Sequence, residues 1–445
     1  MRSPAGAPSL RTLPRRARPR LAKAGQCGET AMETPPMTRP PITGDQTYVK
    51  SINRNVLLRL LLDEPGISRA ALAERSGLTK STVSLLAKEL LDEGWLAEDS
   101  VAATGSLGRR PTPLRIAGRG LALIGAELGT DSIRVAATSL HGEVLQAMAV
   151  PLRDRAPDVA CHQLVELVMT ESARVTRTGA RLLGIGVGLP GAVDTAHGVI
   201  QFAPNLGWHD VEVGQRLARE LGAGGLARVP VYCHNEADLA AIGETAFGSR
   251  PIDDPLVYVS CAVGVGAGIV LNGELFTGAT GAAGEIGHTI LHVDGLQCTC
   301  GRRGCVEAYV GLKAVAHAAG QLKGGEVDRA GLAVDLANPR ASRARKAFAA
   351  AGDALGVLLQ NAWTTFNPKA IVLGGEAVTL GGAHFLDAAV DRLARFGRDA
   401  GVAPPSVRVA RYGDLAVAVG GAAFALNALL RPAGHDTGAL RVHRA

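Results

Sequence analysis

The first regular pattern of apolar positions begins after residue 45 and has the period of an α-helix. Apolar side chains lie three and four residues apart and predict one buried helix face, made of Ile52, Val56, Leu57, Leu60 and Leu61. Residues 63–66 read Asp-Glu-Pro-Gly. Proline and glycine are typical of the end of a helix, so we expect this helix to stop there.

Two shorter helices are predicted next, separated by a glycine turn. Ser68 is expected to cap a helix that reaches Arg75, and Thr79 to cap another that runs to about Glu93. The second of these has an apolar stripe on one side and a basic, hydroxyl-rich face on the other, made of Lys80, Ser81, Ser84 and Lys88. Helix, short turn and helix is typical of DNA-binding modules, and such side chains suit phosphates and base edges. We therefore predict that these four residues contact DNA.

A wing completes this module in the sequence. Short strands are predicted at 95–97 and 114–116, and the loop between them carries Arg109 and Arg110. An arginine-rich loop of this kind can enter a minor groove. Residues 46–118 are therefore predicted to form a winged helix-turn-helix, with both arginines on DNA. The alternative for helices this short is a small protein-interaction module.

From residue 119 the pattern changes to strands, helices and glycine turns, with an internal repeat. Three strands are predicted at 121–128, 133–140 and 144–151, and three more at 256–261, 268–271 and 274–276. Each set has a glycine hairpin, and Asn-Gly at 272–273 is a strong two-residue turn signal. Helical periods recur at 311–322, 342–366, 384–397 and 415–430. The duplicated sheets resemble the actin-like sugar-kinase fold, which implies an α/β domain over 119–432 with two lobes around a cleft.

Polar residues at strand ends are expected to point into that cleft. Residues 188–191 read Gly-Leu-Pro-Gly after an apolar strand, and Asn205 follows downstream. A buried strand at 229–233 runs into Asn235 and Glu236, ahead of a helix at 238–247. Polar side chains between a strand end and a helix start are a usual ligand position in α/β folds. The alternative for Glu236 is that it only favours the first turn of the helix.

Three of the seven cysteines fall within eight residues. His288, Cys298, Cys300 and Cys305 have the spacing His-x9-Cys-x-Cys-x4-Cys, and Gly301 and Gly304 supply tight turns between ligands. Three thiolates and one imidazole form a set that structural Zn²⁺ favours. The sequence therefore predicts a structural zinc site at these four residues. A chance cluster of reduced thiols is the alternative.

Residues 278–307 also carry a family resemblance. The pattern GxxGxxGEIGH followed by CxCGxxGCxE resembles the signature of the ROK proteins, a family of repressors, open reading frames and kinases. The resemblance implies that the zinc loop braces a sugar pocket, with Glu285, His288 and Glu307 facing the sugar. His288 would then direct one ring nitrogen to zinc and the other to the sugar, because the two nitrogens are chemically distinct.

Three parts that ROK kinases use differ here. The Asn-Asp pair with the general base reads Asn235-Glu236, and a misplacement of ~1 Å can cost a hundredfold in rate. The phosphate turn Asp-x-Gly-Gly-Thr reads 127–131 Glu-Leu-Gly-Thr-Asp, which puts a carboxylate where ATP phosphates would lie. The turn Gly-Thr-Gly reads 262–264 Ala-Val-Gly. Only 371–375, Ile-Val-Leu-Gly-Gly, still resembles the adenosine-side loop. We therefore expect that the chain is not an enzyme.

Composition adds little to this interpretation. The chain of 445 residues has 47% hydrophobic and 20% charged residues, which is ordinary for a globular protein, and a net charge of +6 is a mild hint of an anionic partner. Residues 1–45 are predicted to be a disordered basic tail, with Met32 or Met37 as possible true starts, and 433–445 a C-terminal tail. No segment has the ~18 uninterrupted apolar residues of a membrane span, so a cytoplasmic protein without membrane contact is expected.

The combined interpretation is a sugar-responsive repressor of carbohydrate-utilisation genes, resembling the xylose- and N-acetylglucosamine-type repressors of the ROK family. Its partners would be a double-stranded DNA operator and a small sugar effector. It would act as a homodimer or a dimer of dimers, because two-fold symmetry matches a palindromic operator. One alternative is an active sugar kinase that also binds DNA. Another is a zinc-stabilised sugar sensor that acts through protein partners.

Overall fold

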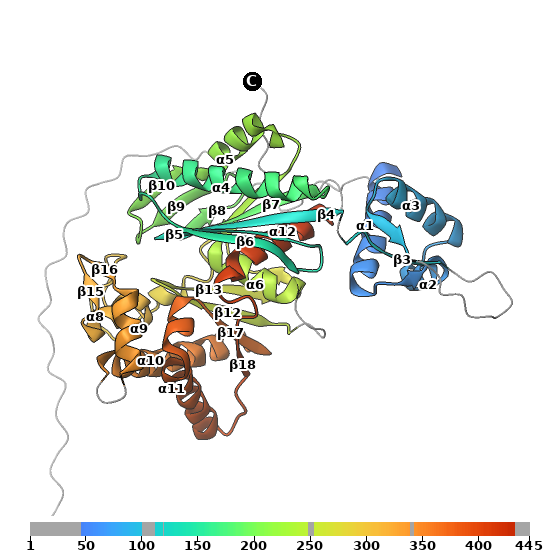
Figure 1. The fold of residues 1–445 in the computed structure, drawn as a ribbon. Helices are drawn as coiled ribbons and strands as arrows, with labels where there is room; N and C mark the ends of the chain where they lie inside the picture. Colours follow the sequence, from blue (N-terminus) through green and yellow to red (C-terminus); the bar gives the residue numbers. More distant parts are fainter. Residues whose placement is uncertain (1–45, 100–111, 119, 248–252, 339–341, 432–445) are drawn as a thin grey trace, which may run out of the picture. The chain divides into compact units, whose positions relative to one another are not determined.

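The computed structural model describes residues 46–99, 112–118, 120–247, 253–338 and 342–431. Its N-terminal part contains three helices and a three-stranded sheet of order β1-β3-β2 (Figure 1). The helices are α1 (Gln46–Asp63), α2 (Arg69–Ser76) and α3 (Lys80–Asp92). The strands are β1 (Ile67–Ser68), β2 (Leu96–Glu98) and β3 (Pro113–Ile116). The two-residue strand β1 was not predicted, because so short a segment shows no alternation.

The helix ends in this part lie where the sequence predicts them. The Ser68 side chain accepts a hydrogen bond from the Ala71 amide, and Thr79 accepts one from Thr82. Gly77 ends α2 with a φ of 68°, a left-handed conformation that glycine adopts without strain. The wing loop, with Arg109 and Arg110, lies outside the described residues.

The first lobe of the larger α/β part is a five-stranded sheet of order β11-β7-β4-β5-β6. Its strands are β4 (Leu121–Leu128), β5 (Ser132–Thr138), β6 (Val144–Pro151), β7 (Arg181–Leu189) and β11 (Val231–Asn235). Helices α4 (Pro157–Arg177) and α5 (Val213–Leu221) cover one face, and α12 (Ala416–Leu429) covers the other (Figure 1). A smaller sheet of β8 (Ala192–Asp194), β9 (Val199–Ala203) and β10 (Trp208–Glu212) lies beside it.

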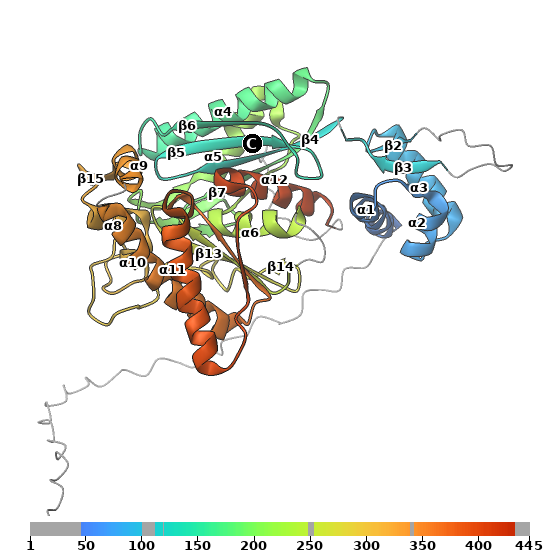
Figure 2. The same cartoon turned by 60° about the horizontal axis from the view of Figure 1, so that its bottom comes forward.

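The second lobe is another five-stranded sheet, of order β14-β13-β12-β17-β18. Its strands are β12 (Leu256–Cys261), β13 (Val265–Leu271), β14 (Glu274–Leu275), β17 (Ala370–Gly374) and β18 (Ser406–Val409). Helix α6 (Glu236–Ala246) packs on one face, and α8 (Leu312–Ala319), α10 (Arg343–Phe366) and α11 (Glu376–Ala400) lie on the other side (Figure 2). Shorter elements complete the lobe: a 3-10 turn (Ile286–His288), α7 (Glu307–Val310), β15 (Leu322–Lys323), β16 (Glu326–Val327) and α9 (Arg329–Ala337).

Helices α6 and α12 pack against each other between the two sheets, at distances that only glycine permits. A Cβ on Gly125 of β4 would lie 1.5 Å from the Ala418 carbonyl oxygen of α12. A Cβ on Gly420 of α12 would lie 1.9 Å from the Leu239 carbonyl oxygen of α6. The backbones are therefore in direct contact, and this contact fixes how closely α6, α12 and β4 pack.

Several elements start earlier than the sequence predicts. Helix α6 begins at Glu236 rather than 238, because the Asn235 side chain caps it. Strand β13 begins at Val265 rather than 268, since its ladder with β12 continues to the pair Cys261 and Val265. Helix α11 begins at Glu376 rather than 384, and the non-helical φ of 48° at Gly382 explains why the periodicity is broken there. Within the described residues, no helix combines the length and apolarity that crossing a bilayer requires.

The glycine contact between β4 and α12 predicts an unequal response to two alanine substitutions. Gly125→Ala should lower the thermal unfolding temperature. Overpacking typically lowers the free energy of unfolding by roughly 1–3 kcal/mol, and the loss should be at the upper end or larger here because the clash is with backbone atoms. Gly118→Ala is the matched control, because a Cβ there meets nothing within 4 Å. Equal unfolding temperatures for the two variants would show that the close approach is not a constraint.

Candidate functional site

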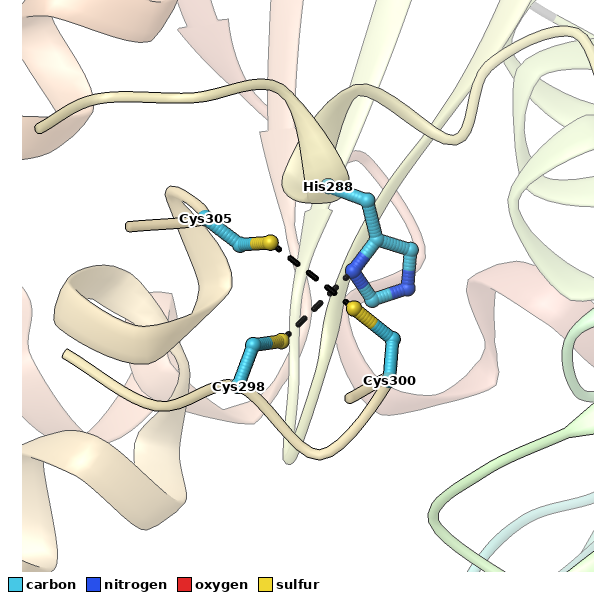
Figure 3. Close-up of side chains that lie close together, drawn as sticks. All are labelled: His288, Cys298, Cys300 and Cys305. Carbon is cyan, nitrogen blue, oxygen red and sulfur yellow. Dashed lines mark hydrogen bonds between the residues drawn. The ribbon is translucent and has the colours of Figure 1, made fainter. Parts of the chain in front are cut away.

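Four potential metal ligands converge in the loop that follows β14. The ligand atoms of His288, Cys298, Cys300 and Cys305 all lie within 4.8 Å of one another. The Cys298 Sγ lies 3.7 Å from His288 Nδ1, and the sulfurs of Cys300 and Cys305 lie 3.8 Å apart (Figure 3). The sequence prediction that these four side chains come together is confirmed.

The cluster has the dimensions of a tetrahedral zinc site. Zinc–sulfur bonds of about 2.3 Å and a zinc–nitrogen bond of about 2.0–2.1 Å imply S···S edges of about 3.8 Å and S···N edges of about 3.6 Å. The two distances above agree with these edges. Three cysteines and one histidine also form a common structural zinc set. The residues present can therefore hold a metal ion of this kind.

Glycine turns shape the cluster loop. Gly301 and Gly304 have φ values of 87° and 81°, which few other residues adopt. A Cβ on Gly304 would also lie 1.8 Å from the His292 carbonyl oxygen. The Gly304 carbonyl accepts a hydrogen bond of 2.7 Å from the Leu291 amide, which ties the two arms of the loop together. The glycines therefore bring distant ligands to one point.

A polar cleft between the lobes lies next to this cluster. Its lining includes all six residues predicted to bind sugar: Asn205, Asn235, Glu236, Glu285, His288 and Glu307. Asn205 and Asn235 come from the first lobe, and Glu285, His288 and Glu307 come from the second. Glu236 begins α6 between them. The structure thus gathers residues that are up to 102 positions apart in the chain, from 205 to 307.

Glu307 is held rigidly at this cleft. Its Oε2 accepts a hydrogen bond of 3.1 Å from the Val265 amide, and its Oε1 accepts one of 2.9 Å from Thr299 Oγ1. Glu307 follows Cys305 by two residues, and Thr299 lies between Cys298 and Cys300. Any ion that fixes the cysteine loop therefore also fixes this carboxylate.

His288 faces both the cluster and the cleft. Its Nδ1 points toward Cys298, while its Nε2 lies 3.7 Å from Glu285 Oε2. Both His288 and Glu285 line the cleft. This arrangement leaves one ring nitrogen toward the cysteines and the other toward the cleft, the geometry that the dual role implied by the ROK resemblance would need.

Asn235 has a structural role besides its place in the cleft. Its Oδ1 accepts a hydrogen bond of 2.8 Å from the Ala237 amide, and its Nδ2 donates one of 2.7 Å to the Gly191 carbonyl. It is therefore the N-cap of α6 and joins that helix to the loop after β7. One amide N–H remains for a ligand.

Glu236 is a carboxyl group in an unfavourable place for a charge. Burial raises its pKa to about 8, and the nearby carboxylates of Glu127 and Glu285 add to the shift. Glu236 is therefore mostly protonated at pH 7. A protonated carboxyl group can donate one hydrogen bond and accept others, but it does not remove a proton from a hydroxyl group.

The sequence analysis did not name Arg134 as a residue of this site. Arg134 of β5 lies directly opposite Glu127 of β4, and its Nη1 lies 3.3 Å from Glu127 Oε2. Both residues line the cleft. The signal was present in the predicted hairpin, because strands at 121–128 and 133–140 can pair these two charged residues. Burial nevertheless raises the pKa of Glu127.

The predicted DNA-contacting residues of α3 lie on one open face. Lys80, Ser81, Ser84 and Lys88 are all exposed, while Val83, Leu86 and Leu90 are buried. The sequence analysis overlooked Leu85, which is 58% exposed on the same helix. An apolar side chain on such a helix can contact a thymine methyl group.

Comparisons with known proteins agree with this architecture. The family model described as ROK family matches residues 123–428, and one described as winged helix-turn-helix DNA-binding matches residues 52–97. The xylose repressor of Bacillus spizizenii is 33% identical over 334 residues, which cover 75% of this chain and 84% of that protein. The N-acetylglucosamine repressor of Escherichia coli O6:H1 is 29% identical, over 75% of this chain and 82% of that protein.

Solved structures show the same fold. A ROK family transcriptional regulator described as a homolog of the E. coli MLC protein has a TM-score of 0.68 at 24% identity, covering 86% of this chain and 97% of that chain. A ROK family glucokinase from Streptomyces griseus, solved with glucose and AMPPNP, has a TM-score of 0.57 at 25% identity, covering 68% of this chain and 98% of that chain. The matched residues, the shared signature and the fold together establish that this chain belongs to the ROK family and carries a winged helix-turn-helix ahead of its ROK domain.

Proposed function

We propose that this chain is a sugar-responsive transcriptional regulator that represses its operator until a sugar binds in the cleft. One observation carries the proposal: an exposed basic face on α3 and a polar cleft built on the ROK signature occur in the same chain. The similar proteins include a xylose repressor and an N-acetylglucosamine repressor. We assign DNA binding to residues 46–118 and sugar binding to 119–432, between tails at 1–45 and 433–445.

The cleft supports a mechanism in which a sugar joins the two lobes. Asn205 and Asn235 would contact hydroxyl groups from one side, and Glu285, His288 and Glu307 from the other. Glu236 would lie between them and donate its proton to a hydroxyl oxygen. A sugar releases DNA only if it binds one lobe arrangement more tightly than the other. Closure would move a dimer into a geometry that no longer spans both half-sites.

We propose that the chain lacks sugar kinase activity. The two relatives compared by sequence above are a xylose repressor and an N-acetylglucosamine repressor, whereas a ROK family glucokinase shares the fold. Glu236 stands where ROK kinases have an aspartate base, and its carboxyl group is one methylene further from the backbone, a displacement of ~1 Å that can cost a hundredfold in rate. Val263 lines the cleft where those kinases have a threonine hydroxyl group. These changes misplace the base and remove a group that would hold a phosphate.

We further propose Zn²⁺ as the ion of the Cys298–Cys300–Cys305–His288 cluster, with a structural role. When bound, the ion would supply folding free energy to the loop and fix the position of Glu307 at the cleft. We also propose a cytoplasmic homodimer or dimer of dimers, because operator DNA is found in that compartment and a two-fold operator needs two copies of α3.

The zinc proposal predicts that the metal and the sugar response are lost together. Cys300→Ser removes one thiolate, so zinc content should fall below the one ion per chain expected of the parent, and sugar should no longer stabilise the protein. Cys161→Ala, a buried cysteine of α4, is the matched control and should retain the metal. Elemental analysis and thermal unfolding provide both measurements. A parent protein that is folded, responds to sugar and contains no zinc would contradict the assignment.

The second prediction concerns catalysis. With ATP, Mg²⁺ and a sugar that stabilises the protein, phosphorylation at pH 7 should not exceed background, because Asp131 places a carboxylate where the ATP phosphates would lie and Val263 replaces a hydroxyl donor. The sugar-induced rise in unfolding temperature serves as the control that the cleft is intact. Turnover at ordinary kinase rates, on the order of 1–100 per second, would instead favour the alternative of an active kinase that binds DNA.

The third prediction separates DNA binding from sugar sensing. Lys88→Ala should weaken operator binding, because a phosphate contact is lost. The slope of log binding constant against log salt concentration should also become shallower by roughly one unit. Glu285→Ala should bind the operator like the parent but remain bound when sugar is added. The operator can be selected by the parent protein from a random duplex pool, and both variants can be titrated at one fixed salt concentration.

Controls make the two outcomes decisive. Lys346→Ala removes the same charge from an exposed position on α10 and should leave operator affinity unchanged. The zinc content of Glu285→Ala should match that of the parent, which separates a cleft effect from loss of the loop. If Lys88→Ala binds like Lys346→Ala, the DNA assignment of α3 fails. If Glu285→Ala is still released by sugar, the cleft assignment fails.

A further inference from the structure

The cleft is lined by many more carboxyl groups than cations. Glu127, Asp131, Glu236, Glu285, Glu307 and Glu376 all line it, and they come from both lobes. Among the described lining residues, Arg134 is the one arginine, and lysine is absent. Arg134 already pairs with Glu127. A ligand that carries its own negative charge would therefore find no uncommitted Lys or Arg side chain in the described lining, and Lys313 lies in an adjoining cavity that shares Asn205, Val263 and Glu307 with the cleft.

One end of the cleft is closed by an ion cluster that bridges the lobes. Arg329, the first residue of α9, binds Asp131 in the β4–β5 turn of the first lobe. The same guanidinium binds Glu376, the first residue of α11 in the second lobe, with Nη2 and Oε2 2.8 Å apart. One arginine thus joins two carboxylates that belong to different lobes.

This cluster stands at the N-terminus of α11, a position that in general favours an anion. Helix α11 follows Gly374 and Gly375, and a glycine turn before a helix N-terminus is a ready-made anion site. Here the Glu376 side chain, itself an anion, stands at that terminus and takes up Arg329. A phosphate that approached Arg329 would also come close to the negative charges of both carboxylates, which repel it.

A second arginine, next to the β4–β5 turn, is also paired with a carboxylate. Arg155, from the loop after β6, has its Nη2 3.1 Å from Glu326 Oε1 of β16, and its Nε donates to the Thr130 carbonyl at 3.2 Å. Thr130 precedes Asp131, so this contact lies beside the Arg329 cluster. Both arginines that the described residues bring to this turn are therefore paired with carboxylates.

We propose that the cleft takes an uncharged, unphosphorylated sugar and that the Asp131–Arg329–Glu376 cluster excludes phosphate-bearing ligands. The proposal rests on the proposed function, because it names the ligand class of that same sugar site. Hydroxyl groups can donate to and accept from the carboxyl groups of the lining without adding charge. A phosphate group adds a charge of about −1.5 to −2 at pH 7, and Arg329 is not free to neutralise it.

The first experiment compares matched ligands with the full-length protein. D-xylose, D-glucose and N-acetyl-D-glucosamine are each tested against the corresponding sugar phosphate by thermal unfolding and calorimetry. At least one uncharged sugar should raise the unfolding temperature, and its phosphate should bind at least about tenfold more weakly. A sugar phosphate that binds as well as its parent sugar overturns the proposal, and so does a protein that binds no uncharged sugar in this panel.

The same ligands distinguish this proposal from the proposed function when operator release is measured alongside. An uncharged sugar that binds but leaves the operator occupied supports the ligand class and contradicts the regulatory function. A sugar phosphate that releases the operator supports the regulatory function and contradicts the ligand class.

The second experiment frees the arginine. Asp131→Asn with Glu376→Gln removes both charges from Arg329, so the preference for a sugar over its phosphate should fall by about tenfold or more, as expected for a charge-assisted contact. Adding Arg329→Gln to these substitutions should restore the preference. Asp158→Asn, which breaks an ion pair with Arg216 outside the lining of the cleft and of the cavity beside it, is the matched control and should not change it. A freed Arg329 that leaves the preference unchanged shows that the cluster is not the determinant.

Discussion

Backbone contact through glycine between α12, the first sheet and α6 is the constraint on which the cleft depends. Gly125 and Gly186 of the sheet and Gly420 of α12 leave no room for a side chain, because the nearest carbonyl oxygens lie 1.5–2.0 Å from where a Cβ would be. The two central helices cannot shift along each other without a clash. The first residue of α6, Glu236, which lines the cleft, is therefore positioned by packing at Leu239, one helical turn away.

A second constraint is electrostatic. Carboxyl groups from both lobes face one partly closed space, and burial with mutual repulsion raises the pKa values of Glu127, Glu236 and Glu285. Arg134 and Arg329 offset part of this charge. The result is a surface rich in hydrogen-bonding groups but poor in free positive charge, which is suited to a ligand that presents hydroxyl groups. The cysteine–histidine loop adds rigidity, since Thr299 and the Val265 amide hold Glu307 in place.

The same architecture serves kinases and regulators because the fold fixes only the frame. The lobes, the central helices and the cysteine loop position a sugar in either case. What differs is a small set of side chains at turns, and here those turns carry Glu236, Val263 and Asp131. Asp131 replaces the threonine of the kinase phosphate turn, and it also takes part in a contact between the lobes, because Arg329 pairs with it and with Glu376. A regulator that must open and close can use such a contact where a kinase needs a nucleotide.

The sequence by itself determined the local features of this protein. Helical periods, the caps at Ser68 and Thr79, the hairpin turns and the cysteine spacing depend on residues close together in the chain, so they could be predicted before the fold was known. The cluster of His288, Cys298, Cys300 and Cys305 and the exposed face of α3 belong to this class. The tertiary structure alone decided the rest. The Asn235 cap that joins α6 to Gly191 and the raised pKa of Glu236 arise from contacts between segments distant in the chain. So does the pairing of Arg329 with residues 198 and 47 positions away, because attraction and burial act through space and leave no spacing in the sequence to detect.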